Sequence, residues 1–323
     1  MDWDDLKYFL ALTRSQTLSE AADKLSVNQT TVSRRLKKFQ RDVGLRLLRH
    51  NNNGIDTTRA GAEVSDAAKQ IESIISALER KLSGLDQHIT GVLRISADEY
   101  MATFENQLFK SFMQRHPKLA LEINNRQNDE KLLQGNVDIA LCWTNQPAEN
   151  LVGRKLCRAE FALYRAHQSE RAAENFATPS GLQKPLSQQS WLVWDQSCNA
   201  KLTEDWIHQQ LPNTAINCRI NSAAAMYHAV KSGLGIAFLP CAYADPDPQL
   251  QRLRNVEKDF GMDIWALTHP DLRGAGKISA FIQHAERYFA EHQHRYAGCL
   301  EKRQQRDSRA HTALEIRGVN TTH

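Results

Sequence analysis

The chain has 323 residues, of which 24% are charged and 41% hydrophobic, and its formal net charge is +4. This composition is typical of a soluble globular protein with two or three folded units, and it excludes a low-complexity disordered chain and a collagen because no residue type dominates. No apolar run reaches the roughly 18 residues that a membrane helix needs. Residues 1–5 are acidic where a signal peptide would be basic, so we expect a cytoplasmic protein.

Positive charge is concentrated in residues 28–50. This segment holds seven arginines and lysines and a single acid, Asp42, whereas the whole chain carries a net charge of only +4. The rest of the chain is therefore slightly acidic. Such an asymmetry indicates contact with nucleic acid, although a solvated basic helix face would produce the same charge count.

Three short helical segments follow one another near the start of the chain. Apolar spacing predicts the first helix over residues 6–12. Thr17 opens a capping box for a second helix at residues 18–25. Asn28 is a suitable N-cap for a third helix, which begins at Gln29. The residues that this third helix is expected to bury are Val32, Leu36 and Phe39.

Two short helices joined by about three residues, the second polar at its start and basic later, predict a helix-turn-helix. Small residues at Ala21 and Ala22 would let the two helices cross closely. An ordinary helical hairpin is the alternative, but it would not explain why exposed polar residues gather at one helix start. Residues 45–49 and 55–58 then form two predicted strands around an Asn-Gly turn, which together predict a wing.

A heptad pattern begins at residue 62. Apolar residues recur there at alternating steps of four and three over about three heptads. Beside a DNA-reading unit this pattern favours dimerisation, because twofold operators need twofold proteins. Packing against the chain's own body is the alternative. The seam consists of Val64, Ala68, Ile71, Ile75, Leu78, Leu82 and Leu85.

From residue 91 onward, strand-like and helix-like segments alternate. This alternation predicts an α/β unit with a parallel sheet covered on both faces. Beyond residue 298 the chain is polar with little periodicity, which predicts a disordered tail at residues 299–323. Strands are predicted at residues 92–96, 119–123, 137–141, 191–194 and within 233–240, and helices at 108–112, 130–133, 202–211 and 223–231.

The chain shows no pattern typical of a metal centre, a cofactor site or an enzyme. Its cysteines occur singly, so we expect reduced thiols rather than a zinc site or a disulfide scaffold. A redox pair of Cys198 and Cys218 is the alternative. No P-loop, Gly-x-Ser-x-Gly, paired-histidine or dinucleotide motif is present, and we predict neither catalysis nor a bound cofactor. The six cysteines are Cys142, Cys157, Cys198, Cys218, Cys241 and Cys299.

Several stretches, in this order, resemble the LysR-type transcriptional regulators. The N-terminal likeness is specific, and the whole resemblance covers about residues 1–295. It rests on Leu-Ser-Glu-Ala-Ala at 18–22, Leu-Ser-Val-Asn-Gln-Thr-Thr-Val-Ser-Arg-Arg-Leu at 25–36 and Thr-Thr-Arg-Ala-Gly at 57–61, and then on residues 93–96, 133–140, 230–240 and 265–281.

The resemblance implies a winged helix-turn-helix DNA-binding domain at residues 1–61 and a linker and dimerisation helix at residues 62–90. A two-lobed α/β effector-binding domain similar to periplasmic binding proteins would follow at residues 91–298. The implied protein is a homodimer or homotetramer that binds double-stranded promoter or operator DNA. It would regulate transcription in response to a small-molecule effector.

We predict that the third helix lies in the major groove of DNA. Glutamine can pair with adenine, arginine with guanine, and a threonine methyl group can touch thymine. The later basic residues would neutralise phosphates, and the wing would reach an adjacent backbone or minor groove. The predicted DNA-binding residues are Gln29, Thr30, Thr31, Ser33, Arg34, Arg35, Lys38, Arg49 and Asn51, with Lys37 and Arg46 as further phosphate contacts.

The implied two-lobed architecture places an effector between the lobes, where loops leave the strand ends. After the first effector-domain strand many family members place Ser or Thr to hold a carboxylate, but this chain has Asp98 and Glu99. Acids there would repel an anion, which favours a cationic or neutral effector, or none. Tyr100 and Trp143 would fit a core position equally well. The predicted effector-binding residues are Ser96, Asp98, Glu99, Tyr100, Trp143, Asp195, Asn221 and Ser222, with Thr144 beside them.

Two other functions fit parts of the sequence. A transport solute-binding protein would share the two lobes, but the acidic N-terminus and the DNA unit speak against it. A non-specific architectural DNA-binding protein would explain the basic helix and leave the α/β domain without a role. We therefore predict a sequence-specific transcriptional regulator.

Overall fold

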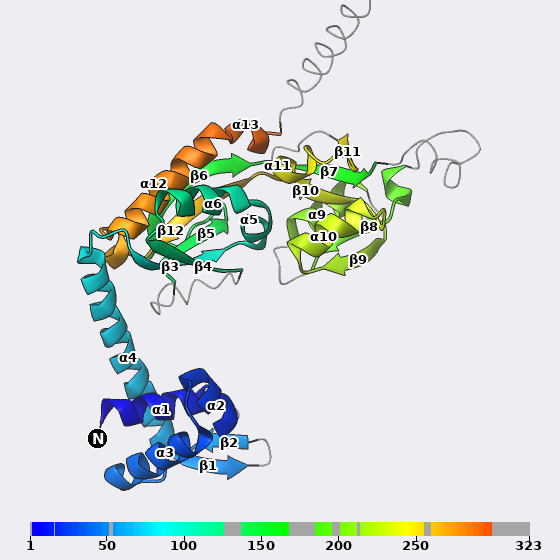
Figure 1. Cartoon of the computed structure of the whole chain (residues 1–323). Coiled ribbons are helices and arrows are strands. Elements are labelled where there is room, and N and C mark those ends of the chain that lie inside the picture. The colour runs from blue at the N-terminus through cyan, green and yellow to red at the C-terminus, as the bar shows by residue number, and fades with distance from the viewer. Residues whose placement is uncertain are drawn as a thin grey trace, which may run out of the picture. The chain divides into compact units, whose positions relative to one another are not determined.

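The computed structural model describes residues 2–15, 17–51, 54–125, 137–167, 185–195, 201–211, 214–254 and 260–298. The helix predicted at residues 130–133 and the tail predicted at residues 299–323 lie outside these ranges. The chain divides into two compact units, residues 1–83 and 84–323 (Figure 1). No helix among the described residues is both long and apolar enough to cross a lipid bilayer.

Unit 1 opens with α1 (Trp3–Thr13), α2 (Leu18–Leu25) and α3 (Gln29–Val43), which pack around one apolar core. The bounds of α2 and the start of α3 confirm the sequence prediction. The Thr17 hydroxyl caps α2 by accepting a hydrogen bond from a first-turn backbone N–H at 3.2 Å. Asn28 holds the N-cap position of α3, but its side chain makes no capping hydrogen bond. The core draws on all three helices, with Leu6, Phe9, Leu12, Ala21, Ala22, Val32, Leu36 and Phe39 buried.

An antiparallel hairpin, β1 (Leu48–Asn51) and β2 (Gly54–Thr57), forms the predicted wing. The first strand begins at Leu48 and not at residue 45, as the sequence had predicted. The preceding residue, Leu47, is fully buried, and its backbone N–H donates to the side-chain carbonyl of Gln40 at 2.8 Å. This segment therefore joins the wing to α3 instead of extending the strand.

One helix, α4 (Arg59–Leu85), contains the whole predicted heptad seam. Ala68 is fully buried and Val64 is partly buried against the core of unit 1, so the start of the seam serves that core, as the alternative interpretation held. Ile75, which the predicted seam includes, is half-buried. Its neighbour Ile74, which the predicted seam does not include, is exposed. Five large apolar side chains of α4 are 38% to 77% exposed. They are Ile71, Ile74, Leu78, Leu82 and Leu85.

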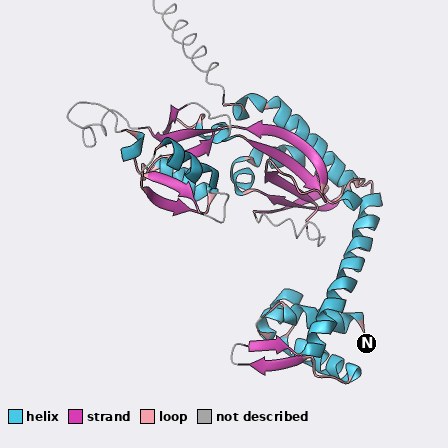
Figure 2. Ribbon diagram, turned by 180° about the vertical axis from the view of Figure 1, so that it is seen from behind, coloured by secondary structure: helices cyan, strands magenta, loops and turns pink. Residues whose placement is uncertain are grey.

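Unit 2 contains two α/β lobes (Figures 1 and 2). The elements of the first lobe are β3 (Gly91–Ala97), α5 (Glu99–Phe104), α6 (Asn106–Arg115), β4 (Leu119–Asn124), β5 (Ile139–Trp143), β6 (Val152–Ala159), β12 (Met262–Thr268), η4 (Pro270–Leu272), α12 (Gly276–Glu291) and α13 (Gln293–Tyr296). Its five strands form one sheet in the order β4-β3-β5-β12-β6. In Figures 1 and 2 the long helix α12 lies beside this sheet.

The second lobe is inserted between β6 and β12 along the chain. Its elements are β7 (Phe161–Ala166), η1 (Leu186–Gln188), β8 (Trp191–Trp194), α9 (Lys201–Gln210), β9 (Ile216–Ile220), α10 (Ala223–Lys231), β10 (Ala237–Pro240), α11 (Cys241–Ala244) and β11 (Leu250–Arg254). β7 pairs antiparallel with β10 and with β11, and β8 pairs parallel with β9. One apolar core includes buried residues of both lobes, such as Leu93 and Met226.

The prediction of a parallel sheet was wrong for part of this unit. β3 runs parallel to β4 and β5, but β12 returns antiparallel to both β5 and β6. The predicted third strand begins at Ile139, two residues later than expected. The sequence pattern also missed β6, because this strand lies at the sheet edge and carries exposed charges at Arg154, Lys155 and Arg158 instead of an apolar run.

Candidate DNA interface and effector region

The start of α3 presents polar side chains to solvent. The buried positions of α3 at Val32 and its i+4 and i+7 neighbours turn the opposite face of the helix outward. Gln29, Thr30 and Arg34 are exposed, and their side chains have no hydrogen-bond or ion-pair partner in the described part of the chain. Thr31 and Ser33 are half-buried between them. This face therefore offers unpaired donors and acceptors of the kind that read base edges.

Two of the predicted DNA-contacting cations are held by a buried acid, Asp5. Arg35 Nη1 lies 3.1 Å from Asp5 Oδ1, and Lys38 Nζ lies 3.0 Å from Asp5 Oδ2. Burial by itself would raise the pKa of Asp5, but hydrogen bonds from Lys38 and Arg35 outweigh burial and lower that pKa. The carboxylate thus ties α1 to α3. Asp5 was missed by the sequence prediction, because only the fold brings it to the basic helix.

The wing carries its own ion pair. Arg49 and Asp56 face each other across the hairpin, with Arg49 Nη2 2.7 Å from Asp56 Oδ2. The hydrogen bonds from Arg49 and from the Thr57 backbone N–H lower the pKa of Asp56. Asn51 belongs to β1, but its side chain lies outside the described part of the structure.

The predicted effector residues follow strand ends in both lobes of unit 2. Ser96 lies near the end of β3 and is buried, and Trp143 ends β5. In the second lobe Asp195 follows β8, and Asn221 and Ser222 follow the neighbouring parallel strand β9. Ligands of α/β proteins bind at such carboxyl ends of strands.

Asp98 and Glu99 have different partners. Asp98 caps α5, because its Oδ1 accepts a hydrogen bond from the Tyr100 backbone N–H at 3.0 Å. The Glu99 carboxylate reaches the second lobe and accepts hydrogen bonds from Ser222 Oγ at 2.6 Å and from the Ala223 backbone N–H at 2.7 Å. It therefore occupies the N-terminus of α10, where backbone N–H groups and the helix dipole favour an anion.

Tyr100 and Trp143 belong to an aromatic cluster with members from both lobes. The Tyr100 ring centroid lies 5.5 Å from that of Trp143, 5.8 Å from Trp194 and 5.9 Å from Tyr243. Tyr100 is 5% exposed and Trp143 is 6% exposed, which fits the alternative that both are core aromatics. Among the described residues, however, Tyr100 Oη and Trp143 Nε1 have no hydrogen-bond partner. Burial and the two preceding acids raise the pKa of Tyr100 well above its ordinary value.

Thr144 forms hydrogen bonds within its own loop after β5. Its hydroxyl donates to the carbonyl of Gln146 and accepts from the Gln146 backbone N–H, each at 3.0 Å. These two bonds close a local turn after β5. Thr144 is therefore used to shape the loop.

A second carboxylate, Glu105, is fully buried at the junction of α5 and α6. It accepts hydrogen bonds from Tyr288 Oη at 2.8 Å and from Tyr296 Oη. Burial and the nearby Glu105 charge raise the pKa of Tyr288 to about 12. These contacts attach α12 and α13 to the first lobe, and no local sequence signal identified them because the partners lie far apart in the chain.

The described cysteines are free thiols, as the single spacing predicted. Burial raises the pKa of Cys157 to about 12 and that of Cys241 to about 11, so both stay protonated at neutral pH. Cys198 lies outside the described residues, and with it the alternative redox pair. Within the described ranges no three His, Cys, Asp or Glu side chains are grouped to hold a metal ion.

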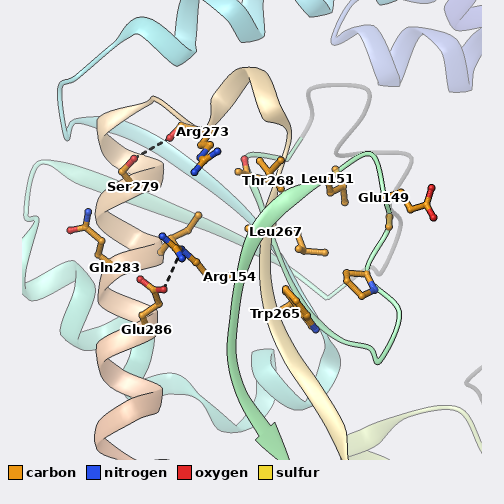
Figure 3. Close-up of a pocket in the computed structure, with 15 residues that line it drawn as sticks. Glu149, Leu151, Arg154, Trp265, Leu267, Thr268, Arg273, Ser279, Gln283 and Glu286 are labelled. Carbon is orange, nitrogen blue, oxygen red and sulfur yellow. Dashed lines mark hydrogen bonds and ion pairs between the residues drawn. The ribbon is translucent and has the colours of Figure 1, made fainter.

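A groove of about 580 Å³ lies on the first lobe, and none of the predicted effector residues lines it (Figure 3). On the side of α12, Arg154 Nε lies 3.5 Å from Glu286 Oε1. Trp265 and Leu151 stand on the other side of β6 (Figure 3). The groove is thus a surface feature separate from the region around Glu99.

A winged helix-turn-helix unit and a two-lobed α/β unit together define a DNA-binding regulator that carries a ligand-binding domain. A family model described as a bacterial regulatory helix-turn-helix protein of the lysR family matches residues 3–62. The LysR substrate binding domain matches residues 86–290. The two matches cover well over half of the sequence, and the chain belongs to the LysR family of transcriptional regulators. The predicted resemblance is confirmed.

Individual relatives support the same assignment. The HTH-type transcriptional regulator YofA of Bacillus subtilis (strain 168) is 27% identical over 255 residues, which cover 76% of this chain and 83% of YofA. The HTH-type transcriptional activator CmpR of Synechocystis sp. is 26% identical over 235 residues, which cover 72% of this chain and 76% of CmpR. Both relatives are transcriptional regulators.

Solved structures share the fold at lower identity. The Vibrio cholerae virulence activator AphB, at full length, has a TM-score of 0.53 and 18% identity, with 88% of this chain and 98% of that chain covered. Full-length CbnR in complex with its target DNA has a TM-score of 0.57 and 17% identity, with coverage of 89% and 99%. The architecture predicted from the sequence is therefore shared with known regulators.

Proposed function

We propose that the chain binds a specific operator through the start of α3 and changes transcription there in response to a small molecule. The observation that carries this proposal is the exposed, unpaired set of Gln29, Thr30 and Arg34 on a family-defined DNA-binding unit. The relatives support a regulator rather than an enzyme, and the cytoplasm, which holds bacterial DNA, is its proposed location.

The proposed base contacts come from the first two turns of α3. Arg34 has the planar fork that binds guanine at two points, and Gln29 has the amide that suits adenine. Thr30, Thr31 and Ser33 are proposed to contact base edges or nearby phosphates.

The remaining cations are proposed to position the protein on the phosphate backbone. The side chains of Arg35 and Lys38 are 32% and 45% exposed, so each retains donors that can reach DNA while bound to Asp5. Arg49 and Asn51 on the wing, with Lys37 and Arg46, complete this set. Contacts of this kind add affinity and salt dependence without sequence information.

Pairing of two copies along α4 is proposed to form a twofold dimer whose two DNA-binding units contact the operator. The apolar side chains of Ile71, Ile74, Leu78, Leu82 and Leu85 are exposed in the single chain. A seam of this size would be unfavourable in water and matches a coiled-coil interface. In this proposal residues 1–61 bind DNA, residues 62–90 link and dimerise, and residues 91–298 hold the effector.

The effector is proposed to bind between the two lobes of unit 2. Strand ends from both lobes bring polar residues there, and the aromatic cluster around Tyr100 supplies flat apolar surface. The proposed lining includes Ser96, Asp98, Glu99, Tyr100, Trp143, Asp195, Asn221 and Ser222.

The Arg34→Ala variant tests this function. The operator is first selected from genomic fragments with the purified chain, and the affinities for operator and for random DNA are then measured by gel shift. We expect Arg34→Ala to lose about 1–3 kcal/mol on the operator, with a much smaller change on random DNA. Arg287→Ala, an exposed arginine of α12, is the matched control and should leave both affinities unchanged.

Two outcomes would contradict the proposal. An Arg34→Ala variant with parental affinity and selectivity would show that α3 does not read the sequence. A parent chain that binds operator and random DNA equally would instead support the non-specific architectural function.

A further inference from the structure

The contact between Glu99 and α10 joins the two lobes. Glu99 is the first residue of α5 in the first lobe, whereas Ser222 is the N-cap and Ala223 the first residue of α10 in the second lobe. The carboxylate takes hydrogen bonds from Ser222 Oγ at 2.6 Å, from the Ala223 N–H at 2.7 Å and from the Ala224 N–H at 3.4 Å. Ser222 Oγ in turn accepts from the Ala225 N–H at 3.2 Å, so the whole first turn of α10 is engaged.

This arrangement has the chemistry of an occupied anion site. The first N–H groups of a helix have no partner within the helix and point at whatever lies before it. With the helix dipole they bind a carboxylate or a phosphate well. Here the carboxylate is part of the protein, so a free anion would have to displace Glu99 or lie beside a like charge.

A second observation concerns two unsatisfied polar groups, one of them on the residue after Glu99. The Tyr100 hydroxyl and the Trp143 indole N–H are both buried, have no hydrogen-bond partner among the described residues and lie on rings 5.5 Å apart. An indole N–H only donates, and a buried donor without an acceptor is unfavourable. These groups therefore need an acceptor. Tyr100 directly follows Glu99 in α5, and the Glu99 charge contributes to the raised pKa of Tyr100.

We propose that Glu99 takes the place of an effector carboxylate at α10. The interlobe region of this chain therefore excludes acidic effectors and accepts an uncharged ligand whose acceptor atoms meet Tyr100 Oη and Trp143 Nε1. This inference rests on the proposed function for the assignment of the interlobe region as the effector site, and it names the class of ligand and the residue that selects it.

Removal of the Glu99 side chain tests directly whether its carboxylate fills an anion site at α10. Glu99→Ala deletes a fragment of the size and charge of acetate, so acetate should refill the site in the full-length variant. We expect acetate to raise the thermal midpoint of Glu99→Ala by about 2–4 °C in a saturable way. Acetamide, which has the same shape without the charge, and chloride at equal ionic strength should have no such effect.

Two further proteins serve as controls. The wild-type chain should respond no more to acetate than to acetamide, because its own carboxylate fills the site. Glu99→Gln fills the same space without charge and should lose stability with no recovery in acetate. If Glu99→Ala is unfolded in chloride, its folded fraction after refolding in acetate and in acetamide, measured by circular dichroism, replaces the thermal midpoint.

The proposal is overturned if acetate and acetamide affect Glu99→Ala equally, or if acetate stabilises the wild-type chain as much as the variant. This readout depends on unit 2 alone. Operator binding by the same preparations, measured by gel shift, reports separately on the proposed function, so either hypothesis can fail while the other stands.

Discussion

Asp5 shows how one side chain controls the basic helix of unit 1. Its carboxylate is fully buried and receives Arg35 and Lys38 from α3. A buried carboxylate without such partners would be strongly unfavourable. The acid thus ties α1 to α3, and it pairs with two cations of the helix that is proposed to contact DNA.

Asp5→Asn is expected to destabilise unit 1 by about 1–3 kcal/mol at pH 7, a range kept low because both cations are partly exposed. The pKa of Asp5 is lowered in the folded chain, so its contribution is complete above the unfolded value of about 3.9 and is lost as pH falls through the folded value. Urea unfolding of the two proteins at pH 7 and pH 3 should therefore show a difference that shrinks in acid.

Asp23→Asn is the matched control, since Asp23 is an exposed acid on α2. It should change the free energy of unfolding by less than about 0.5 kcal/mol. A constant difference between wild type and Asp5→Asn from pH 7 to pH 3 would contradict the ion-pair explanation.

At the scale of elements, α4 performs two tasks along one helix. Its first turns complete the core of unit 1 through Ala68 and Val64, and its later turns expose apolar residues. The junction with the wing is close, because a Cβ atom on Gly61 would lie 2.0 Å from the Leu47 carbonyl oxygen. Thr58 also joins this junction, donating to the Arg46 carbonyl and accepting from the Gly61 N–H.

Gly61→Ala should destabilise unit 1 by about 1–3 kcal/mol, because the added methyl group forces α4 away from the backbone before β1. The sign of the change in the free energy of unfolding shows whether the contact between Gly61 and Leu47 restrains α4. Alanine in an open helical position is more favourable than glycine by about 1 kcal/mol, so a stabilised variant would show that this contact does not restrain α4. Chemical denaturation of the full-length chain gives the measurement.

At the scale of the whole molecule, the proposed function depends on a second copy of the chain. In the proposed function two α3 helices read a twofold operator, and the exposed seam of α4 is the proposed surface for pairing. Leu78 and Leu82 lie at its centre and are 57% and 61% exposed in the single chain.

The double change Leu78→Asp and Leu82→Asp should yield a monomer in sedimentation velocity and weaken operator binding at least tenfold. The thermal midpoint of the single chain should change little, because both side chains are exposed. Glu79→Ala, on the same helix, is the control and should remain an oligomer. A double variant that still sediments as the parent would exclude α4 as the pairing surface.

The amino-acid sequence determined the local features of this protein. The helix bounds around Thr17 and Asn28, the wing, the heptad seam and the alternation of the effector unit depend on capping, turn residues and periodicity, which act between neighbours in the chain. For the same reason the exposed face of α3 could be predicted from its buried positions. Family motifs placed these elements in order.

Tertiary structure alone decided which charges are paired and which polar groups are buried. Asp5 meets Arg35 and Lys38 across 30 or more residues, and Glu99 meets Ser222 across 123. The antiparallel return of β12 and the burial of Glu105 have the same origin. No local sequence pattern predicts such contacts, because their free energy depends on desolvation and on partners that only folding brings together.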